Sequence, residues 1–283
     1  MTPRTVQQLF DLTGKTALIT GGSRGLGLQM AFALGEAGAK IMLSSRKASD
    51  LEEATAQLQA AGIDARWIAA DCAKDEEINR LADETLERMG DIDILVNNAG
   101  AAWGAPAEDH PADAWDKVMN LNVRGYFLLS QRVAKKSMIA KSSKEGVANG
   151  ATQGVANGAT QGGSIINIAS IAGLGGNPSG MNTIAYNTSK GAVINFTRAL
   201  AAEWGKYNIR VNAICPGFFP SKMTLGTLKA LGEDKLKEGA PLKRLGDDED
   251  LKGLCLLYAS NAGKHITGQW LAVDGGVSIV SGG

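Results

Sequence analysis

Thr20-Gly21-Gly22-Ser23-Arg24-Gly25-Leu26-Gly27 decides the fold, because it joins a short apolar run, Thr16 to Thr20, to a segment of helical periodicity, Leu26 to Ala37. Glycines permit a tight turn and a close backbone approach, and the free N–H groups at the amino end of a helix attract anions. The sequence therefore predicts a strand, a turn and a helix that together hold a phosphate. The spacing is GxxxGxG rather than the GxGxxG of the common dinucleotide fingerprint, so a simple turn stays open as an alternative.

Strand-like and helix-like patterns alternate along the rest of the chain. This alternation predicts one doubly wound α/β domain over residues 1–283, with a seven-stranded, mostly parallel sheet and helices on both faces. The predicted strands are Thr16–Thr20, Lys40–Ser44, Arg66–Ala70, Ile92–Val96, Ser164–Ile168, Arg210–Ile214 and Trp270–Val273. The predicted helices are Leu26–Ala37, Asp50–Ala60, Asp75–Met89, Ala112–Met138, Ala185–Trp204 and Asp248–Ala259.

The composition excludes several classes of protein. The 283 residues include 29 Lys and Arg and 29 Asp and Glu, so no net charge draws the chain to nucleic acid or to an anionic membrane. Three scattered cysteines and two histidines argue against a disulfide framework, a metal site and a serine–histidine–aspartate triad. The sequence has no signal-like segment and no run of about 18 apolar residues, which predicts a cytoplasmic protein.

One segment interrupts the alternation. Residues 146–153 read GVANGATQ, and residues 154–161 repeat them letter for letter. This glycine-rich insertion, residues 142–162, buries too little apolar surface to offset its ordering entropy, which predicts a mobile loop. Because it joins a helix to the next strand of a parallel sheet, we expect it at the edge that carries the amino ends of the strands, away from ligands.

Polar or glycine-containing segments follow the other predicted strands. The carboxyl ends of parallel strands meet at one edge of the sheet, where open α/β proteins bind ligands, so the sequence predicts a binding site there. The segments are Ser45-Arg46, Asp71-Cys72, Asn97-Asn98-Ala99-Gly100, Ser170 and Pro216-Gly217.

Tyr186 and Lys190 are four residues apart in a predicted helix, so their side chains share one face. A free tyrosine has a pKa near 10, and a neighbouring ammonium group favours the phenolate. The spacing therefore indicates a proton-transfer pair, in which Lys190 moves the pKa of Tyr186 toward neutrality. An amphipathic tyrosine beside a solvated lysine is the structural alternative.

Taken in order along the chain, these motifs resemble the short-chain dehydrogenase/reductase family. The resemblance implies a Rossmann-like fold and an oxidoreductase in which a nicotinamide cofactor supplies the hydride. It rests on T-G-x-x-x-G-x-G at 20–27, N-N-A-G at 97–100, Asn122, Ser170 and Y-x-x-x-K at 186–190, followed by Pro216-Gly217 and Val273-Asp274-Gly275-Gly276.

The resemblance implies roles for four residues. Tyr186 would exchange a proton with the substrate oxygen, and Ser170 would hydrogen-bond that oxygen. Lys190 would hold the nicotinamide ribose, and Asn122 would anchor a water that links Lys190 to solvent. Taken alone, Ser170 could cap local backbone and Asn122 could bend a helix. Ser170 precedes Tyr186 by 16 residues, a few more than is common in the family, so we expect the stretch Gly173–Thr183 to bulge beside the substrate pocket.

NADP(H) is the cofactor that the resemblance implies. Arg46, rather than a carboxylate, follows the second strand, and Arg24 adds a guanidinium that suits a 2′-phosphate. Solvated surface arginines are the alternative. Asp71, placed near the adenine, could equally cap the next helix, and Ser221 replaces a more common threonine. The full set of implied cofactor contacts is Gly21, Ser23, Arg24, Gly25, Leu26, Gly27, Ser45, Arg46, Asp71, Cys72, Asn98, Ala99, Gly100, Tyr186, Lys190, Pro216, Gly217, Phe218 and Ser221.

The substrate is expected to meet less regular segments, including a lid over residues 217–241. Their apolar side chains suit a hydrophobic ketone, and the sequence resembles reductases of 3-oxoacyl thioesters, including those near rhamnolipid synthesis. Sugar and polyol dehydrogenases, such as gluconate dehydrogenases, share the framework, and a non-catalytic nucleotide-binding sensor is a third candidate. The apolar residues are Trp103, Phe218, Phe219, Met223 and Leu225.

Two further expectations follow. The helix through Asp113–Met138 and the tyrosine helix commonly form subunit contacts in such proteins, which predicts a homotetramer or a homodimer. Cys215 has no adjacent histidine, so we expect it to be a small buried side chain rather than a nucleophile.

Overall fold

The computed structural model describes residues 3–142, 162–177, 180–222 and 224–280. Its strands form one parallel sheet in the order β3-β2-β1-β4-β5-β6-β7. The strand order reverses between β1 and β4, and ligands of such sheets bind beside the carboxyl ends at this switch point. The strands are β1 (Thr16–Thr20), β2 (Lys40–Ser45), β3 (Ala65–Ala69), β4 (Ile94–Asn97), β5 (Gly163–Ile168), β6 (Ile209–Pro216) and β7 (Trp270–Val273).

The predicted α/β fold is confirmed, and each predicted strand is present with bounds that move by at most two residues. The central strands could be found because a parallel sheet is covered on both faces, so its strands are continuous apolar runs. All five residues of β1 are buried, for example.

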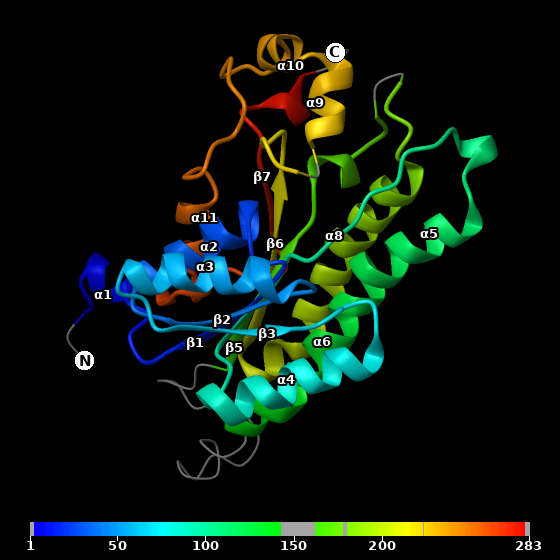
Figure 1. Cartoon of the computed structure of the whole chain (residues 1–283). Helices are drawn as coiled ribbons and strands as arrows, with labels where there is room; N and C mark the ends of the chain where they lie inside the picture. The colour runs from blue at the N-terminus through cyan, green and yellow to red at the C-terminus, as the bar shows by residue number, and fades with distance from the viewer. Residues whose placement is uncertain (1–2, 143–161, 178–179, 223, 281–283) are drawn as a thin grey trace.

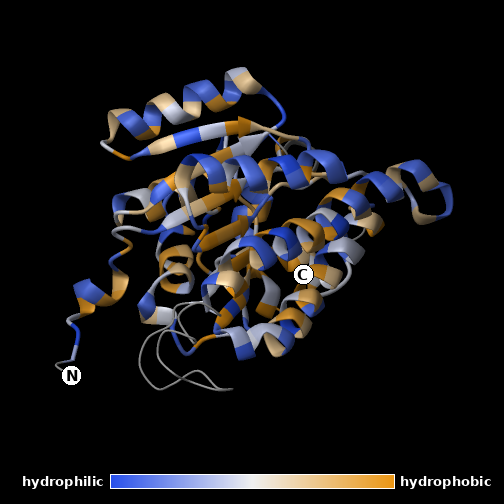
Figure 2. Cartoon of the chain, turned by 90° about the horizontal axis from the view of Figure 1, so that it is seen from below, coloured by the Kyte–Doolittle hydropathy of each residue, from blue (hydrophilic) through white to orange (hydrophobic). Residues whose placement is uncertain are grey.

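Helices cover both faces of the sheet (Figure 1). α2, α3 and α11 pack on one face, and α4, α6 and α8 pack on the other. Apolar strands lie inside, and the outer helices carry many polar residues (Figure 2). The helices are α1 (Val6–Phe10), α2 (Gly25–Glu36), α3 (Ala48–Ala60), α4 (Asp75–Met89), α5 (Ala112–Met119), α6 (Gly125–Val133), α8 (Ile184–Trp204), α9 (Leu225–Leu231), α10 (Glu233–Gly239) and α11 (Lys252–Ala259).

The predicted helix Ala112–Met138 is not a uniform α-helix. Two wider π-helical turns, Asn120–Arg124 and Ala134–Met138, interrupt it, and such turns often occur at functional sites. Gly125 follows the first of them, and a Cβ at this position would lie 2.4 Å from the carbonyl oxygen of Cys72. A glycine is therefore needed where the helix approaches the backbone that follows β3.

Short polar helices were the elements that the sequence pattern missed. α1, α9 and α10 were not predicted, because each spans seven residues or fewer and shows no long apolar period. The predicted helix Asp248–Ala259 begins at Lys252 instead, because carboxylates of the preceding residues bond backbone N–H groups in a turn. No helix within the described ranges has both the length and the apolar character that a membrane span needs.

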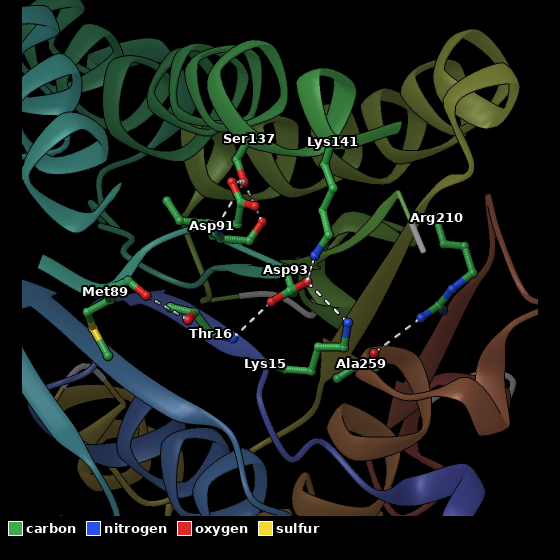
Figure 3. A network of polar contacts seen from close by, with 10 residues as sticks. Lys15, Thr16, Met89, Asp91, Asp93, Ser137, Lys141, Arg210 and Ala259 are labelled. Carbon is green, nitrogen blue, oxygen red and sulfur yellow. Dashed lines mark hydrogen bonds and ion pairs between the residues drawn. The ribbon is translucent and has the colours of Figure 1, made fainter. Parts of the chain in front are cut away.

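A polar network holds the amino edge of the sheet (Figure 3). Asp93, just before β4, accepts hydrogen bonds from the backbone N–H of Thr16 at 3.1 Å and from Nζ of Lys15 and Lys141 at 3.3 and 2.8 Å. Residues 143–161 of the duplicated insertion lie outside the described residues. Its flanks, at Lys141 and at Gly162 directly before β5, lie at the amino edge where the insertion was expected.

Candidate active site

The glycine turn after β1 is held against the loop after β4. Asn98 Nδ2 donates hydrogen bonds to the carbonyl oxygens of Thr20 and Gly21, at 2.9 and 3.0 Å. Gly21 has a φ of +63°, and a Cβ there would lie 2.8 Å from this Nδ2. A Cβ on Gly27 would lie 2.3 Å from the Gly21 carbonyl oxygen. The close approach of turn and helix therefore requires glycine at both positions.

Thr20 is a residue of the site that the sequence interpretation missed. Its Oγ1 accepts hydrogen bonds from the backbone N–H groups of Asn98 and Ala99, at 3.0 and 3.1 Å, and donates one to the carbonyl oxygen of Val96 at 3.3 Å. A hydroxyl at the end of an otherwise apolar strand was the signal that could have identified it.

The amino end of α2 is free to receive an anion. α2 begins at Gly25, and its N-cap residue, Arg24, makes no side-chain capping bond. The first N–H groups of a helix lack partners within the helix, and with the helix dipole they favour a phosphate. Ser23 lies half-buried in the same turn, whereas Leu26 packs against the core beneath it.

The end of β2 carries the charges expected of a phosphate site. Nη1 of Arg24 reaches Oδ2 of Asp50, in the first turn of α3, at 3.1 Å, and Arg46 is exposed. The Oγ of Ser45 is buried without a hydrogen-bond partner among the described residues. The guanidinium groups of Arg24 and Arg46, which follow β1 and β2, suit the oxygens of a phosphate. With the glycine turn, these residues fit a dinucleotide that carries a ribose phosphate.

Asp71 and Cys72, which were expected near the cofactor, follow β3 and make local contacts within the chain. Oδ1 of Asp71 accepts a hydrogen bond from the N–H of Ala73 at 3.1 Å in a turn before α4, whose N-cap residue is Lys74, so Asp71 does not cap this helix. The Cys72 side chain packs in the core, and burial raises the pKa of its thiol to about 12. Only the backbone of Cys72 is therefore available to a cofactor.

The segment that leaves β6 is fixed to the chain after β7. A Cβ on Gly217 would lie 2.6 Å from the Cβ of Asp274, so only glycine allows this contact. Pro216 ends β6, and the carbonyl oxygen of Phe218 accepts a hydrogen bond from Gly246 N–H at 2.9 Å. The first residues of the expected lid are therefore held in place by contacts with the chain after β7 and with Gly246.

Phe219 and Ser221 of the expected lid make contacts within the protein. Phe219 does not line a substrate pocket: it is 3% exposed, packs in the main core and would collide with any Cβ on Gly246. The hydroxyl of Ser221 lies 2.9 Å from Thr224 Oγ1, so this hydroxyl is already engaged. Leu225 is exposed, and Met223 lies outside the described residues.

Tyr186, Lys190 and Ser170 meet at the carboxyl edge of β5. Nζ of Lys190 donates a hydrogen bond to the carbonyl oxygen of Ile168 at 2.6 Å and lies 5.6 Å from the centre of the Tyr186 ring. The Ser170 hydroxyl is hydrogen-bonded to the Tyr186 phenol and accepts a bond from the N–H of Ala172 at 3.1 Å. The structure thus brings together the three residues predicted to handle the proton.

Burial sets the proton affinities of this pair. Desolvation raises the pKa of Tyr186, while the hydrogen bond from Ser170 lowers it by less. Desolvation also lowers the pKa of Lys190 from 10.5 to about 8. The pKa of Tyr186 is therefore raised rather than moved toward neutrality as predicted, and burial of the phenol is the largest cause. The phenol is protonated at neutral pH.

Asn122 lies at the site and makes its hydrogen bonds to Ala101 and Ser189. Its Oδ1 accepts a hydrogen bond from Ala101 N–H at 2.8 Å, and its Nδ2 donates to the carbonyl oxygen of Ala101 at 2.9 Å and to Oγ of Ser189 at 2.9 Å. A Cβ on Gly100 would lie 3.3 Å from the Asn122 Oδ1 and 3.7 Å from Lys190 Nζ. Its place in a π-helical turn agrees with the helix-bending alternative.

The long connection between Ser170 and Tyr186 is hydrogen-bonded to the start of α8 and to the segment after β4. The side-chain amides of Asn177 and Asn187 bond each other reciprocally at 3.0 Å, which holds the connection to the start of α8. The carbonyl oxygen of Asn182 accepts from Ala105 N–H at 2.8 Å, which joins it to the segment after β4. Trp103 is 48% exposed in that segment, so an apolar side chain is available beside the site.

The cysteines take no part in this chemistry. Cys215 is fully buried and free, as predicted, and burial raises the pKa of its thiol to about 12. Among the described residues, no group of three or more His, Cys, Asp or Glu side chains is placed to hold a metal ion.

Known proteins similar to this chain include dehydrogenases and reductases. The family model described as short chain dehydrogenase matches residues 15–230. The rhamnolipids biosynthesis 3-oxoacyl-[acyl-carrier-protein] reductase of Pseudomonas aeruginosa is 36% identical over 95% of this chain and 98% of its own length. Gluconate 5-dehydrogenase of Gluconobacter oxydans is 35% identical over 96% and 97%, respectively.

Solved structures similar to this chain include proteins of the same two kinds. A gluconate 5-dehydrogenase from Burkholderia cenocepacia, in complex with NADP and tartrate, superposes with a TM-score of 0.85 at 32% identity and covers 98% of this chain and all of its own. The Pseudomonas aeruginosa RhlG/NADP active-site complex has a TM-score of 0.83 at 34% identity, with 96% and 99% covered.

Proposed function

The chain belongs to the short-chain dehydrogenase family, and from this membership and the geometry of the site we propose that it is an NADPH-dependent reductase of a hydrophobic ketone. A 3-oxoacyl thioester is the substrate class that we favour, and the product is a secondary alcohol. One observation carries the proposal: the phenol of Tyr186, protonated and hydrogen-bonded to Ser170, lies beside the buried Lys190 at the ligand-binding edge of the sheet.

The chain's own residues handle the proton and the developing charge. Bound NADPH supplies the hydride. Tyr186 donates its proton to the carbonyl oxygen, and its raised pKa keeps that proton available at neutral pH. Ser170 donates a hydrogen bond to the same oxygen and stabilises its negative charge. Lys190 binds ribose hydroxyls and, when charged, favours the phenolate that remains. Asn122 holds the loop at Ala101 against the catalytic helix.

The cofactor preference rests on charge at the end of β2. Arg24 and Arg46 offer guanidinium groups to a 2′-phosphate. Two relatives of similar fold are described as complexes with NADP, which supports the same choice here. Steady-state kinetics test it: a kcat/KM for NADPH above that for NADH is expected, and the reverse order refutes the preference.

The substrate class rests on the composition and exposure of the segments expected to meet the substrate. The segments 101–110 and 170–184 contain no lysine or arginine, whereas the lid segment 217–241 contains Lys222, Lys229, Lys235 and Lys237. Trp103, Ile184 and Leu225 are large apolar side chains that are 43 to 51% exposed. The exposed apolar side chains favour an uncharged, apolar substrate over a sugar acid. The 3-oxoacyl reductase and the gluconate 5-dehydrogenase are almost equally similar to this chain, at 36% and 35% identity.

An NAD(P)-dependent sugar or polyol dehydrogenase is the second candidate function. The gluconate 5-dehydrogenases among the relatives, at 35% and 32% identity, are the observation that favours it. A non-catalytic sensor is a weaker alternative, because Asn122, Ser170, Tyr186 and Lys190 are all retained.

One screen separates these candidates. Purified protein is offered ketones, including 3-oxoacyl thioesters, with NADPH and NADH, and polyols or gluconate with NADP and NAD, while nicotinamide absorbance is followed. Fast reduction of the apolar ketones is expected. Oxidation of gluconate without ketone reduction would establish the dehydrogenase, and binding of NADPH without any turnover would establish the sensor.

We also propose a homo-oligomer, a tetramer or a dimer. Phe127 on α6 is 42% exposed and meets Phe196 on α8 edge to face, with ring centres 6.4 Å apart. The edge strand β7 exposes Trp270 and Leu271, at 42% and 51%. Large exposed apolar groups on helices and on a sheet edge commonly mark subunit contacts. Light scattering at micromolar concentration should therefore give a multiple of 29.5 kDa, and a monomer would reject the assembly.

A further inference from the structure

Ser189 is fully buried on α8 between Tyr186 and Lys190, and the chemistry above does not use it. Its Oγ donates a hydrogen bond to the backbone carbonyl oxygen of Tyr186 at 2.8 Å. The same atom accepts a hydrogen bond from Nδ2 of Asn122 at 2.9 Å. Both strong bonds of this hydroxyl are therefore made to residues of the candidate active site.

Asn122 extends the connection to the loop after β4. Its amide makes a two-point contact with the backbone of Ala101, at 2.8 and 2.9 Å, and uses its remaining N–H for Ser189. Ala101 follows Gly100, which approaches both Asn122 and Lys190 closely. A continuous series of hydrogen bonds thus runs from this loop through Asn122 and Ser189 to the backbone of Tyr186.

The helix that carries Asn122 is shaped for this contact. Asn122 lies in the π-helical turn Asn120–Arg124 and is fully buried, so its amide depends on partners within the protein. Since Ala101 and Ser189 together bond its oxygen and both N–H groups, the amide has a single orientation. A single orientation allows it to fix one element relative to another.

We propose that Ser189 is a positioning residue that sets the first turn of α8, and with it the Tyr186 phenol, against the loop at 98–101. Ser189 does not touch the reacting atoms and acts through the backbone of Tyr186. The inference rests on the proposed function, because it assigns Ser189 a part in proton donation by Tyr186. Small misplacements of a reacting group, near 1 Å, can lower the rate about 100-fold.

The same helix provides a matched control. Thr197 is also fully buried, and its Oγ1 donates to the carbonyl oxygen of Val193 at 2.8 Å and accepts from Nδ2 of Asn167 at 2.9 Å. Like the hydroxyl of Ser189, it donates to a backbone carbonyl oxygen of α8 and accepts from an asparagine amide. Thr197 lies about two helical turns beyond Ser189 along α8, farther from Tyr186. Deleting its hydroxyl costs a similar buried hydrogen bond, and Thr197 is linked to the loop after β4 indirectly, through Asn167 and Asn97.

The experiment compares side chains of equal shape. At position 189, the Ser189→Thr variant keeps the hydroxyl and the Ser189→Val variant removes it. At position 197, the wild-type threonine keeps the hydroxyl and the Thr197→Val variant removes it. We expect kcat for carbonyl reduction to be at least about tenfold lower in Ser189→Val than in Ser189→Thr. KM and the NADPH dissociation constant, measured by fluorescence, should change little in either variant. Wild type and Thr197→Val should have similar kcat values.

The opposite results are equally clear. Equal kcat values for the two Ser189 variants, or a ratio no larger than that between wild type and Thr197→Val, would overturn the positioning role. If the larger side chains prevent folding, Ser189→Ala and Thr197→Ala give the same comparison. A wild-type protein that reduces no carbonyl overturns the proposed function and this inference with it, whereas an active wild type with equal Ser189 variants overturns this inference alone.

Discussion

Lys190 should cost the protein stability in a pH-dependent way. Its side chain is 3% exposed, and desolvation lowers the pKa of its ammonium from 10.5 to about 8. Between these two values the unfolded chain binds a proton that the folded chain lacks, so the free energy of unfolding rises with pH. The whole difference corresponds to roughly 3 kcal/mol, of which roughly 2 kcal/mol falls between pH 8 and pH 10.

The assay is urea unfolding of wild type and Lys190→Met at pH 7, 8, 9 and 10, at one protein concentration. Other ionising groups are common to both proteins, so they largely cancel in the difference between the two free energies of unfolding. From pH 8 to pH 10 this difference should move in favour of wild type by roughly 2 kcal/mol. A difference that stays flat, or that moves toward the variant, would refute the claim that burial sets the proton affinity of Lys190.

Three further predictions follow from the site. Ser170→Ala should lower kcat about 100-fold or more, as expected for one lost donor to the substrate oxygen, and a near-normal rate would move that role elsewhere. Asp50→Asn removes the ion pair with Arg24, so the variant should bind 2′,5′-ADP about two- to fivefold more tightly than wild type does. Its affinity for AMP, which lacks the 2′-phosphate, should be unchanged. Equal 2′,5′-ADP titration curves for the two proteins would show that Asp50 does not compete with the phosphate for Arg24. Deletion of residues 146–153 should leave kcat nearly unchanged, since both flanks lie at the amino edge, and a large loss in a folded protein would contradict this placement.

Much of the fold could be predicted because its signals are local. A covered parallel sheet needs continuous apolar runs, and β1, whose five residues are all buried, was found with its observed bounds. The glycine turn could be recognised because contacts of 2.3 and 2.8 Å exclude any side chain at Gly27 and Gly21. Features that depend on tertiary packing were harder to predict. The π-helical turn at Asn122, for example, is needed only because the helix meets other parts of the chain.

The errors at the site share one physical origin, which is burial. Phe219 was expected to face a substrate because it is apolar, yet it fills the core over Gly246. The pKa of Tyr186 was expected to fall, yet desolvation of the buried phenol raises it. Ser189 escaped notice because a buried hydroxyl on a helix has no sequence signature until its partners are known.

Replacement of Tyr186 by phenylalanine tests the central claim most directly. The variant keeps the ring and loses only the hydroxyl that is hydrogen-bonded to Ser170. We expect NADPH to bind with nearly unchanged affinity while kcat for reduction of the best ketone falls at least about 100-fold, the scale of general acid catalysis. A Tyr186→Phe protein that reduces this ketone at the wild-type rate would contradict the account.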